Sequence, residues 1–202
     1  MSTIAPARLF AMLLLACAAA GAGGCDGAHA TSAYHAADIG SFMPALSFHL
    51  TGPGGKPITE QFVHGKTTIL YFGYTHCPDE CPTTLARLSA TLHMLGPAAD
   101  QVRVLFVSVD PQRDTPAVLA QYAHYFAPQV VGASGTDAEL MALAKRYRVA
   151  YRRDPPDAQG NYAVYHSNAV FVFDADGRAR LLVPDTETPT QLAQDLSTLS
   201  AS

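Results

Sequence analysis

The chain contains 202 residues, of which 49% are apolar and 15% are charged, and its formal net charge at pH 7 is −4. This size and composition suit one globular domain with a substantial core, together with an appendage. The acidic balance and the lack of any cluster of Lys and Arg in the sequence argue against a nucleic-acid partner.

The N-terminal appendage has the pattern of a secretory signal. An Arg precedes an apolar run over residues 9–20, and small residues then lead to Cys25. The run is shorter than the roughly 20 apolar residues that a membrane-spanning helix needs. We therefore interpret residues 1–24 as a lipoprotein-type signal peptide, residues 25–41 as a flexible tether that is lipid-anchored at Cys25, and residues 42–202 as the folded domain.

Two other processing sites remain open. Cys17 offers a competing lipidation site, and ordinary cleavage after Ala30 is a third option. All three options export the domain. Only Cys77 and Cys81 then remain in its folded part, in an oxidising compartment.

The first half of the domain alternates strands and helices. Periodicity and turn residues predict, in chain order, a strand over 45–50 that the turn at 52–55 folds back as a hairpin, a buried strand over 67–72, a helix over 82–95, a buried strand over 102–109 and a helix over 116–126. This order is typical of parallel strands joined by crossover helices.

The second half ends in a hairpin and a helix. A capping box predicts a helix over 136–147, followed by a short strand over 149–151, a loop over 152–161, a strand over 169–173, a turn at 174–177, a strand over 179–183 and a last helix from Pro189. All these elements together predict a thioredoxin-like α/β sandwich with an N-terminal hairpin and a C-terminal hairpin plus helix.

Cys77 and Cys81 lie where the buried strand over 67–72 runs into the next helix. Functional groups gather at the carboxyl ends of strands in such sheets, and we expect the positive end of the helix to lower the pKa of the thiols. The pair is a structural disulfide, a redox pair or a metal site. Three residues separate the cysteines, one more than in a thioredoxin motif, so the spacing alone does not decide.

Other side chains bear on this choice. His166 lies beside the start of a second predicted strand, the one over 169–173, and could reach the cysteines if that strand lies next to theirs. Two thiolates and one imidazole are too few for a closed zinc site, but they suit copper. We interpret His76, which adjoins Cys77, as a surface histidine, because adjacent residues usually point apart. Asp110 either lies near the cysteines or simply forms an Asp-Pro turn.

Several blocks of the sequence carry a resemblance to a known family. They are residues 71–85 (YFGYTHCPDECPTTL), residues 107–116 (VSVDPQRDTP), His166–Ser167 and the turn at 174–177. Over about residues 42–199, the chain resembles the Sco/SenC family. The resemblance implies a thioredoxin fold anchored outside the inner membrane, which delivers copper to the CuA centre of cytochrome c oxidase or reduces that centre's cysteines before loading.

By position, the family's copper ligands fall on Cys77, Cys81 and His166. The resemblance therefore implies one Cu(I) or Cu(II) ion per domain, a location on the periplasmic face of the bacterial inner membrane, and a partner in the oxidase subunit that carries CuA. Tyr165 stands where the family commonly has an acidic residue. This difference could change how the imidazole is oriented or how basic it is.

We therefore expect an exported copper metallochaperone and not a turnover enzyme. The alternative is a thiol-disulfide oxidoreductase that uses Cys77 and Cys81 to reduce the cysteines of a client copper site. A peroxide-scavenging thiol enzyme on the same fold is disfavoured, because the cysteines are closely spaced and the histidine is distant in the sequence.

Overall fold

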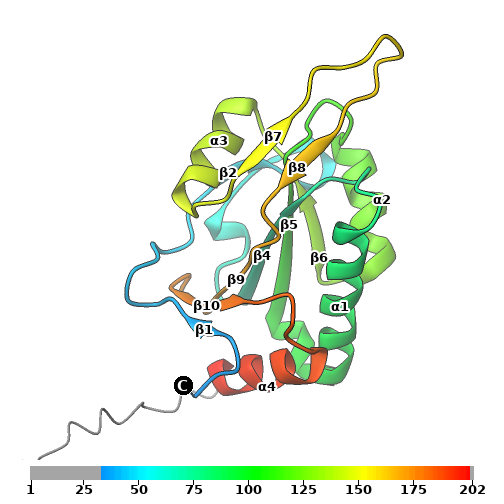
Figure 1. Cartoon of the computed structure of the whole chain (residues 1–202). Coiled ribbons are helices and arrows are strands. Elements are labelled where there is room, and N and C mark those ends of the chain that lie inside the picture. Colours follow the sequence, from blue (N-terminus) through cyan, green and yellow to red (C-terminus); the bar gives the residue numbers. More distant parts are fainter. Residues whose placement is uncertain (1–32, 201–202) are drawn as a thin grey trace, which may run out of the picture. The chain divides into compact units, whose positions relative to one another are not determined.

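The computed structural model describes residues 33–200 (Figure 1). The expected signal peptide, both candidate lipidation sites, Cys17 and Cys25, and the cleavage site after Ala30 lie outside these residues. Within the described part of the chain, every helix is too short or too polar to span a bilayer.

A six-stranded mixed sheet in the order β1-β10-β9-β4-β5-β6 forms the centre of the fold. Its middle strand β4 (Thr67–Gly73) is parallel to β5 (Val102–Ser108), which is parallel to β6 (Val130–Ala133). On its other side, β9 (Val170–Phe173) runs antiparallel to β4. Every residue of β4 is buried, as its continuous apolar run predicts for a strand covered on both faces.

The far edge of the sheet joins an early and a late segment of the described residues. β10 (Ala179–Val183) pairs antiparallel with β9 and also with β1 (Ala37–Asp38). Ala36 and Ile39, which flank β1, are buried in the core. The packed part of the chain therefore includes residues before position 42, where we expected the domain to begin.

The described residues form α1 (Glu80–Leu95), α2 (Pro116–Phe126), α3 (Asp137–Arg146) and α4 (Pro189–Ser200). α1 packs against α4, and α2 packs along β6 (Figure 1). The hydroxyl of Thr136 accepts from the backbone N–H of Glu139, and the Glu139 carboxylate accepts from that of Thr136, so the predicted capping box is confirmed.

Two small antiparallel sheets accompany the main sheet. They are formed by β2 (His49–Thr51) with β3 (Pro57–Thr59), and by β7 (Tyr151–Arg153) with β8 (Val164–His166). Three short 3-10 segments are η1 (Pro53–Gly55), η2 (Glu60–Phe62) and η3 (Gly96–Gln101). The β7–β8 hairpin, yellow and orange in Figure 1, projects at the end of the fold opposite α4.

The predicted fold class is confirmed, and most elements lie where the sequence predicts them. The first predicted strand shortens to β2, and α1 begins at Glu80, ahead of the expected start at Pro82. β1, β6 and β8 were not predicted, and β7 extends into the predicted loop over 152–161. β6 has only four residues and includes a Gly, and β1 has two, so neither gives a periodic signal.

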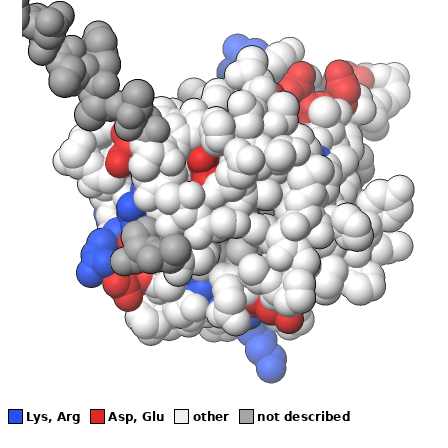
Figure 2. Space-filling view, turned by 90° about the horizontal axis from the view of Figure 1, so that it is seen from below, with Lys and Arg blue, Asp and Glu red and all other residues white. Residues whose placement is uncertain are grey.

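Figure 2 shows the molecule from the side on which α4 lies in Figure 1. On this face, Lys and Arg lie in separate small groups among Asp and Glu (Figure 2). α4 itself has one charged residue, Asp195, which is buried. Its carboxylate accepts hydrogen bonds from the backbone N–H groups of His35 and Ala36 at 2.9 and 2.8 Å. This carboxylate therefore ties the segment before β1 to α4.

Candidate metal centre

Cys77, Cys81 and His166 come together at the carboxyl end of β4. Cys77 lies in the loop after β4, Cys81 in the first turn of α1, and His166 at the end of β8. One ligand atom from each residue lies within 4.8 Å of the other two. The Nε2 atom of His166 is 3.3 Å from Sγ of Cys81, and the backbone N–H of Cys81 donates to Sγ of Cys77 at 3.3 Å. Both cysteines are free thiols.

The sheet topology explains this convergence. Val170 of β9 lies opposite Tyr71 of β4, so the segment that joins β8 to β9 runs past the end of β4 and brings His166 there. Gly73, the last residue of β4, makes room for Cys81, because a Cβ at this position would lie 2.8 Å from the Sγ atom. The pairing of β9 with β4 and the glycine at position 73 thus place the imidazole next to the thiols.

The two thiols have different environments. Cys81 is fully buried, and burial raises the pKa of its thiol to about 12. Our expectation that the helix end would favour a thiolate is therefore wrong for Cys81, because the loss of solvation outweighs the helix field. Cys77 is only partly buried. It is thus the thiol that an incoming ion or partner reaches first, and any ion that binds Cys81 must displace a proton.

His166 is held in the form that can bind a metal. Its Nδ1 atom is 3.1 Å from the carbonyl oxygen of Ser167, and since a carbonyl only accepts, Nδ1 carries the proton. The lone pair of Nε2 therefore faces Cys81. Burial lowers the pKa of His166, which also favours the neutral imidazole. The rings of Tyr71 and Tyr74 meet the imidazole edge-on, with centroids 6.2 and 5.9 Å away.

Asn168, which has no distinguishing signal in the sequence, connects the segment after β8 to α1. Its Oδ1 atom accepts from the hydroxyls of Tyr71 and Thr84, at 2.9 and 3.4 Å. Its Nδ2 group donates to the carboxylates of Glu80 and Asp185, at 3.1 and 3.0 Å. One amide thus uses its full hydrogen-bonding capacity on partners from three other segments, β4, α1 and the segment after β10. It fixes the chain just after β8 against the first turn of α1.

A cleft of about 390 Å³ opens beside these groups. Cys77 and His166 line it, together with Glu80 at the start of α1 and Tyr165 of β8. The thiol of Cys77 and the imidazole are therefore both accessible from the same side of the molecule.

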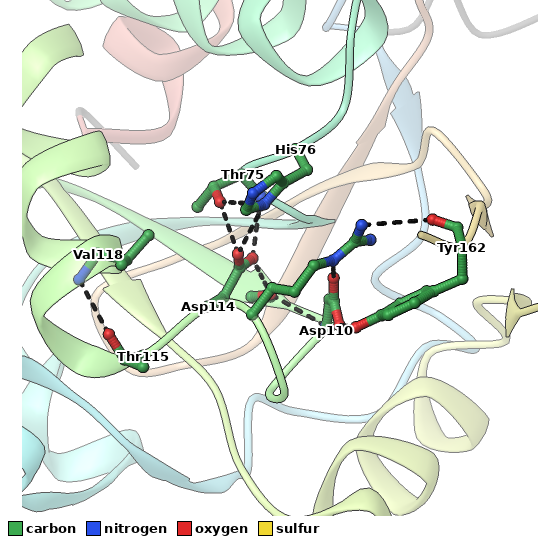
Figure 3. Close-up of polar contacts among 9 residues, drawn as sticks. Thr75, His76, Asp110, Asp114, Thr115, Val118 and Tyr162 are labelled. Atoms are coloured by element: carbon green, nitrogen blue, oxygen red, sulfur yellow. Dashed lines mark hydrogen bonds and ion pairs between the residues drawn. The ribbon is translucent and has the colours of Figure 1, made fainter. Parts of the chain in front are cut away.

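His76 does not join this group. Its Nδ1 atom lies 3.1 Å from the hydroxyl of Thr75 and 3.7 Å from Oδ1 of Asp114, on the side shown in Figure 3. About half of its side chain is exposed. This arrangement agrees with our interpretation of His76 as a surface histidine.

Tyr165 occupies the position where the Sco/SenC resemblance leads one to expect an acidic residue. Its side chain is exposed, and the guanidinium of Arg152 lies 4.6 Å from its ring centroid. A phenol offers the imidazole no carboxylate, and this ring contacts a cation of the neighbouring strand. The backbone carbonyl of Ser167 is what orients His166.

The fold and this group of side chains define a class: a thioredoxin-like protein in which a buried strand leads to three side chains that could hold a soft metal ion. The chain belongs to the SCO1/SenC family, whose model matches residues 40–201. It is 41% identical over 143 residues to Protein SCO2, mitochondrial, of Saccharomyces cerevisiae, over 69% of this chain and 47% of the yeast protein.

Solved structures show the same fold. ScoI of Bradyrhizobium japonicum, solved with copper bound, is 39% identical with a TM-score of 0.70, over 77% of this chain and 98% of ScoI. Yeast Sco1 with copper bound is 32% identical with a TM-score of 0.71, over 79% of this chain and 90% of Sco1. The chain spans about half the length of the first curated relatives that it matches.

Proposed function

We propose that this protein is an exported copper carrier that delivers copper to the CuA centre of cytochrome c oxidase. In this proposal, Cys77, Cys81 and His166 bind one copper ion. The observation that carries it is the convergence of two thiols and one imidazole within 4.8 Å. These donors suit copper and are too few for a closed zinc site. The copper bound by Bradyrhizobium ScoI supports the choice of ion, and the Sco/SenC resemblance supports the choice of partner.

Transfer by ligand exchange needs an open side at the ion. The cleft beside Cys77 and His166 provides this side, and the partly buried Cys77 is the ligand that a partner's thiol can replace first. Cys81 is buried behind it. The ion can therefore stay bound to Cys81 until the partner supplies its own ligands, and no change in oxidation state is required.

Copper uptake also moves protons. Two thiols that bind Cu(I) as thiolates release two protons. The Cu(I) ion and the two thiolates together then carry a net charge of −1. The imidazole binds as the neutral form that its lowered pKa and its Nδ1 hydrogen bond favour. Uptake at Cys81 is thus the step at which the buried proton leaves.

A copper titration of the reduced protein tests the proposal. We expect one equivalent of copper to bind, with a sulfur-to-copper charge-transfer band for Cu(II). The band should be lost in Cys77→Ser, and its position and intensity should change in His166→Ala. His76→Ala serves as the matched control, because His76 lies outside the ligand group. A Cys77→Ser protein that keeps the wild-type band would contradict the proposed ligand set.

The alternative, a thiol-disulfide oxidoreductase, is less well supported. A thiol with a pKa of about 12, like that of Cys81, is a poor participant in thiol exchange at neutral pH. The imidazole of His166 next to Sγ of Cys81 is more typical of a metal site than of a redox-active cysteine pair. His166→Ala separates the two functions, because it should impair copper binding and leave reduction of a client disulfide unchanged.

The proposal includes membrane attachment through a lipid on Cys25 and a location on the periplasmic face of the inner membrane. The support is the sequence pattern alone, an apolar run and small residues before Cys25. The intact mass of the mature protein tests it. A diacylated chain that begins at Cys25 is expected, whereas a chain that begins at Cys17, or after Ala30 without lipid, would overturn this part.

A further inference from the structure

One loop contacts both segments that carry the candidate ligands. The β5–α2 loop (residues 109–115) follows β5 at the same end of the sheet as Cys77. Its Asp114 is buried and accepts hydrogen bonds from the backbone N–H and the hydroxyl of Thr75, at 2.9 and 2.6 Å (Figure 3). Ser108 also donates to Asp114, at 2.5 Å. Because Thr75 lies two residues before Cys77, Asp114 fixes the start of the cysteine loop.

The start of the β5–α2 loop contacts the β7–β8 hairpin, which carries His166. Asp110 is fully buried, and its Oδ1 atom accepts from the hydroxyl of Tyr162 at 2.6 Å (Figure 3). Its Oδ2 atom accepts from Nε of Arg113 at 2.5 Å. The Arg113 guanidinium lies 3.8 Å from the ring centroid of Tyr162 and donates to the Tyr162 carbonyl at 3.3 Å. The hydroxyl, the ring and the backbone of Tyr162 are therefore all held by one ion pair.

Tyr162 is well placed to control the position of His166. It lies two residues before β8 and four residues before His166. β8 has only three residues and ends at His166. At the other end of β8, the N–H of Ser167 donates to the carbonyl of Ala150 at 2.8 Å. The short strand is thus fixed at both ends. At the end that leads to the projecting loop, the N–H of Asp154 donates to the carbonyl of Ala163 at 2.9 Å, and Tyr162 is the residue that joins this end to the β5–α2 loop.

We propose that Tyr162, Asp110 and Arg113 are positioning residues, which hold β8 so that the imidazole of His166 stays next to Cys81. The consequence of this inference rests on the proposed copper-carrying role. The contact that the inference explains, between His166 and Cys81, involves residues of this chain alone. Bonds from copper to sulfur and nitrogen are only about 2 Å long, so a small shift of β8 takes the imidazole out of reach.

The consequence depends on the oxidation state of copper. Thiolates alone suit Cu(I), whereas Cu(II) depends more on the imidazole. Loosening β8 should therefore weaken Cu(II) binding and leave Cu(I) binding by Cys77 and Cys81 nearly unchanged. The β5–α2 loop would in this way determine whether the site uses its third ligand.

Tyr162→Phe tests the proposal, because it removes the hydroxyl that Asp110 accepts and keeps the ring over Arg113. Tyr162 is only partly buried, so the variant is expected to fold. Tyr125→Phe is the matched control, since it also removes one tyrosine hydroxyl. Tyr125 lies on α2 and is 85% exposed. Both variants are made in the full chain and compared with the wild type in the reduced state.

The first measurement needs no copper. Nuclear Overhauser effects between the rings of His166 and Tyr74, whose centroids lie 5.9 Å apart, should be strong in the wild type and in Tyr125→Phe. They should weaken in Tyr162→Phe. Unchanged effects in Tyr162→Phe would overturn the proposal, whatever the protein does with copper.

The second measurement uses copper. Tyr162→Phe should bind Cu(II) about tenfold more weakly, as is typical when a residue that orients a metal ligand is changed, with reduced nitrogen hyperfine coupling in the electron paramagnetic resonance spectrum. Its Cu(I) affinity should stay within about twofold of the wild type. Equal Cu(II) affinity in both proteins would overturn the positioning role. A wild type that binds no copper would instead refute the proposed function, while the ring contacts still decide the role of Tyr162.

Discussion

The Sγ atom of Cys81 lies 3.3 Å from Nε2 of His166, although 85 positions separate the two residues in the sequence. Burial raises the pKa of Cys81 to about 12 and lowers the pKa of His166. Both shifts favour the neutral form of the group. The thiol of Cys81 therefore donates its proton toward the imidazole nitrogen, and in the proposed function copper must replace that proton to bind Cys81.

The first prediction concerns the pH dependence of copper binding. Because Cys81 keeps its proton up to its pKa of about 12, the apparent affinity for Cu(I) should rise with pH. Each proton released contributes about a tenfold rise per pH unit. Competition with a Cu(I) chelator at several pH values measures the slope. Cys81→Ser should bind more weakly and with a shallower slope, and an unchanged slope would mean that Cys81 is not a ligand.

The second prediction concerns Gly73. A Cβ at this position would lie 2.6 Å from the ring of Phe106 and 2.8 Å from Sγ of Cys81. Gly73→Ala should therefore overpack the core and reduce the free energy of unfolding by about 1–3 kcal/mol. It should also displace Cys81 and weaken copper binding. Urea unfolding of the copper-free variant and a copper titration measure the two effects, and a variant with wild-type values in both would show that Cys81 has free space.

The third prediction concerns Asn168. Its amide donates to Glu80 and Asp185, so Asn168→Asp would place a third carboxylate between two others. The lost donors and the like charges should reduce the free energy of unfolding by about 1–3 kcal/mol at neutral pH. The loss should diminish as pH falls toward about 4, where carboxylates take up protons. Asn168→Ala, which loses the hydrogen bonds without adding charge, should show no such recovery in unfolding experiments at both pH values.

The central strands β4 and β5 were predictable because each has seven buried or nearly buried residues around an apolar run, Ile69–Phe72 in β4 and Val104–Val107 in β5. Turn and cap residues at Thr136 and Pro189 likewise marked helix starts that the structure confirms. The position of His166 was only a conditional inference. It required β9 to pair with β4, which is a property of the sheet order and not of either strand's sequence.

Features that arise from tertiary packing could not be predicted from the sequence. The helix end suggested a low thiol pKa, but the burial of Cys81 depends on the elements that cover it. Asp110 was noticed as a polar residue directly after a strand, yet its partners Arg113 and Tyr162 include one that lies 52 positions away. Asn168 had no signal beyond its place near His166. Polar residues at strand ends therefore indicate where a site lies, but they do not indicate which residues they will hydrogen-bond with.

A buried carboxylate in the segment between β10 and α4 leads to a further prediction. Glu187 is buried, and neither of its carboxylate oxygens has a hydrogen-bond partner among the described residues. Burial first, and the nearby Asp195 carboxylate second, raise the pKa of Glu187 from 4.5 to about 7. Its folded-state pKa thus exceeds its unfolded value. Its contribution to stability is fully present below the unfolded pKa and is lost as pH rises through about 7.

Glu187→Gln removes this titration and should therefore flatten the decline in stability between about pH 5 and pH 8. Relative to the wild type, the variant should gain on the order of 1–3 kcal/mol in free energy of unfolding over this range. Urea midpoints at the two pH values measure the change. Asp100→Asn, at an exposed carboxylate, is the control and should keep the wild-type dependence. If Glu187→Gln also keeps it, Glu187 is ionised without cost, and a solvent path to its carboxylate must exist.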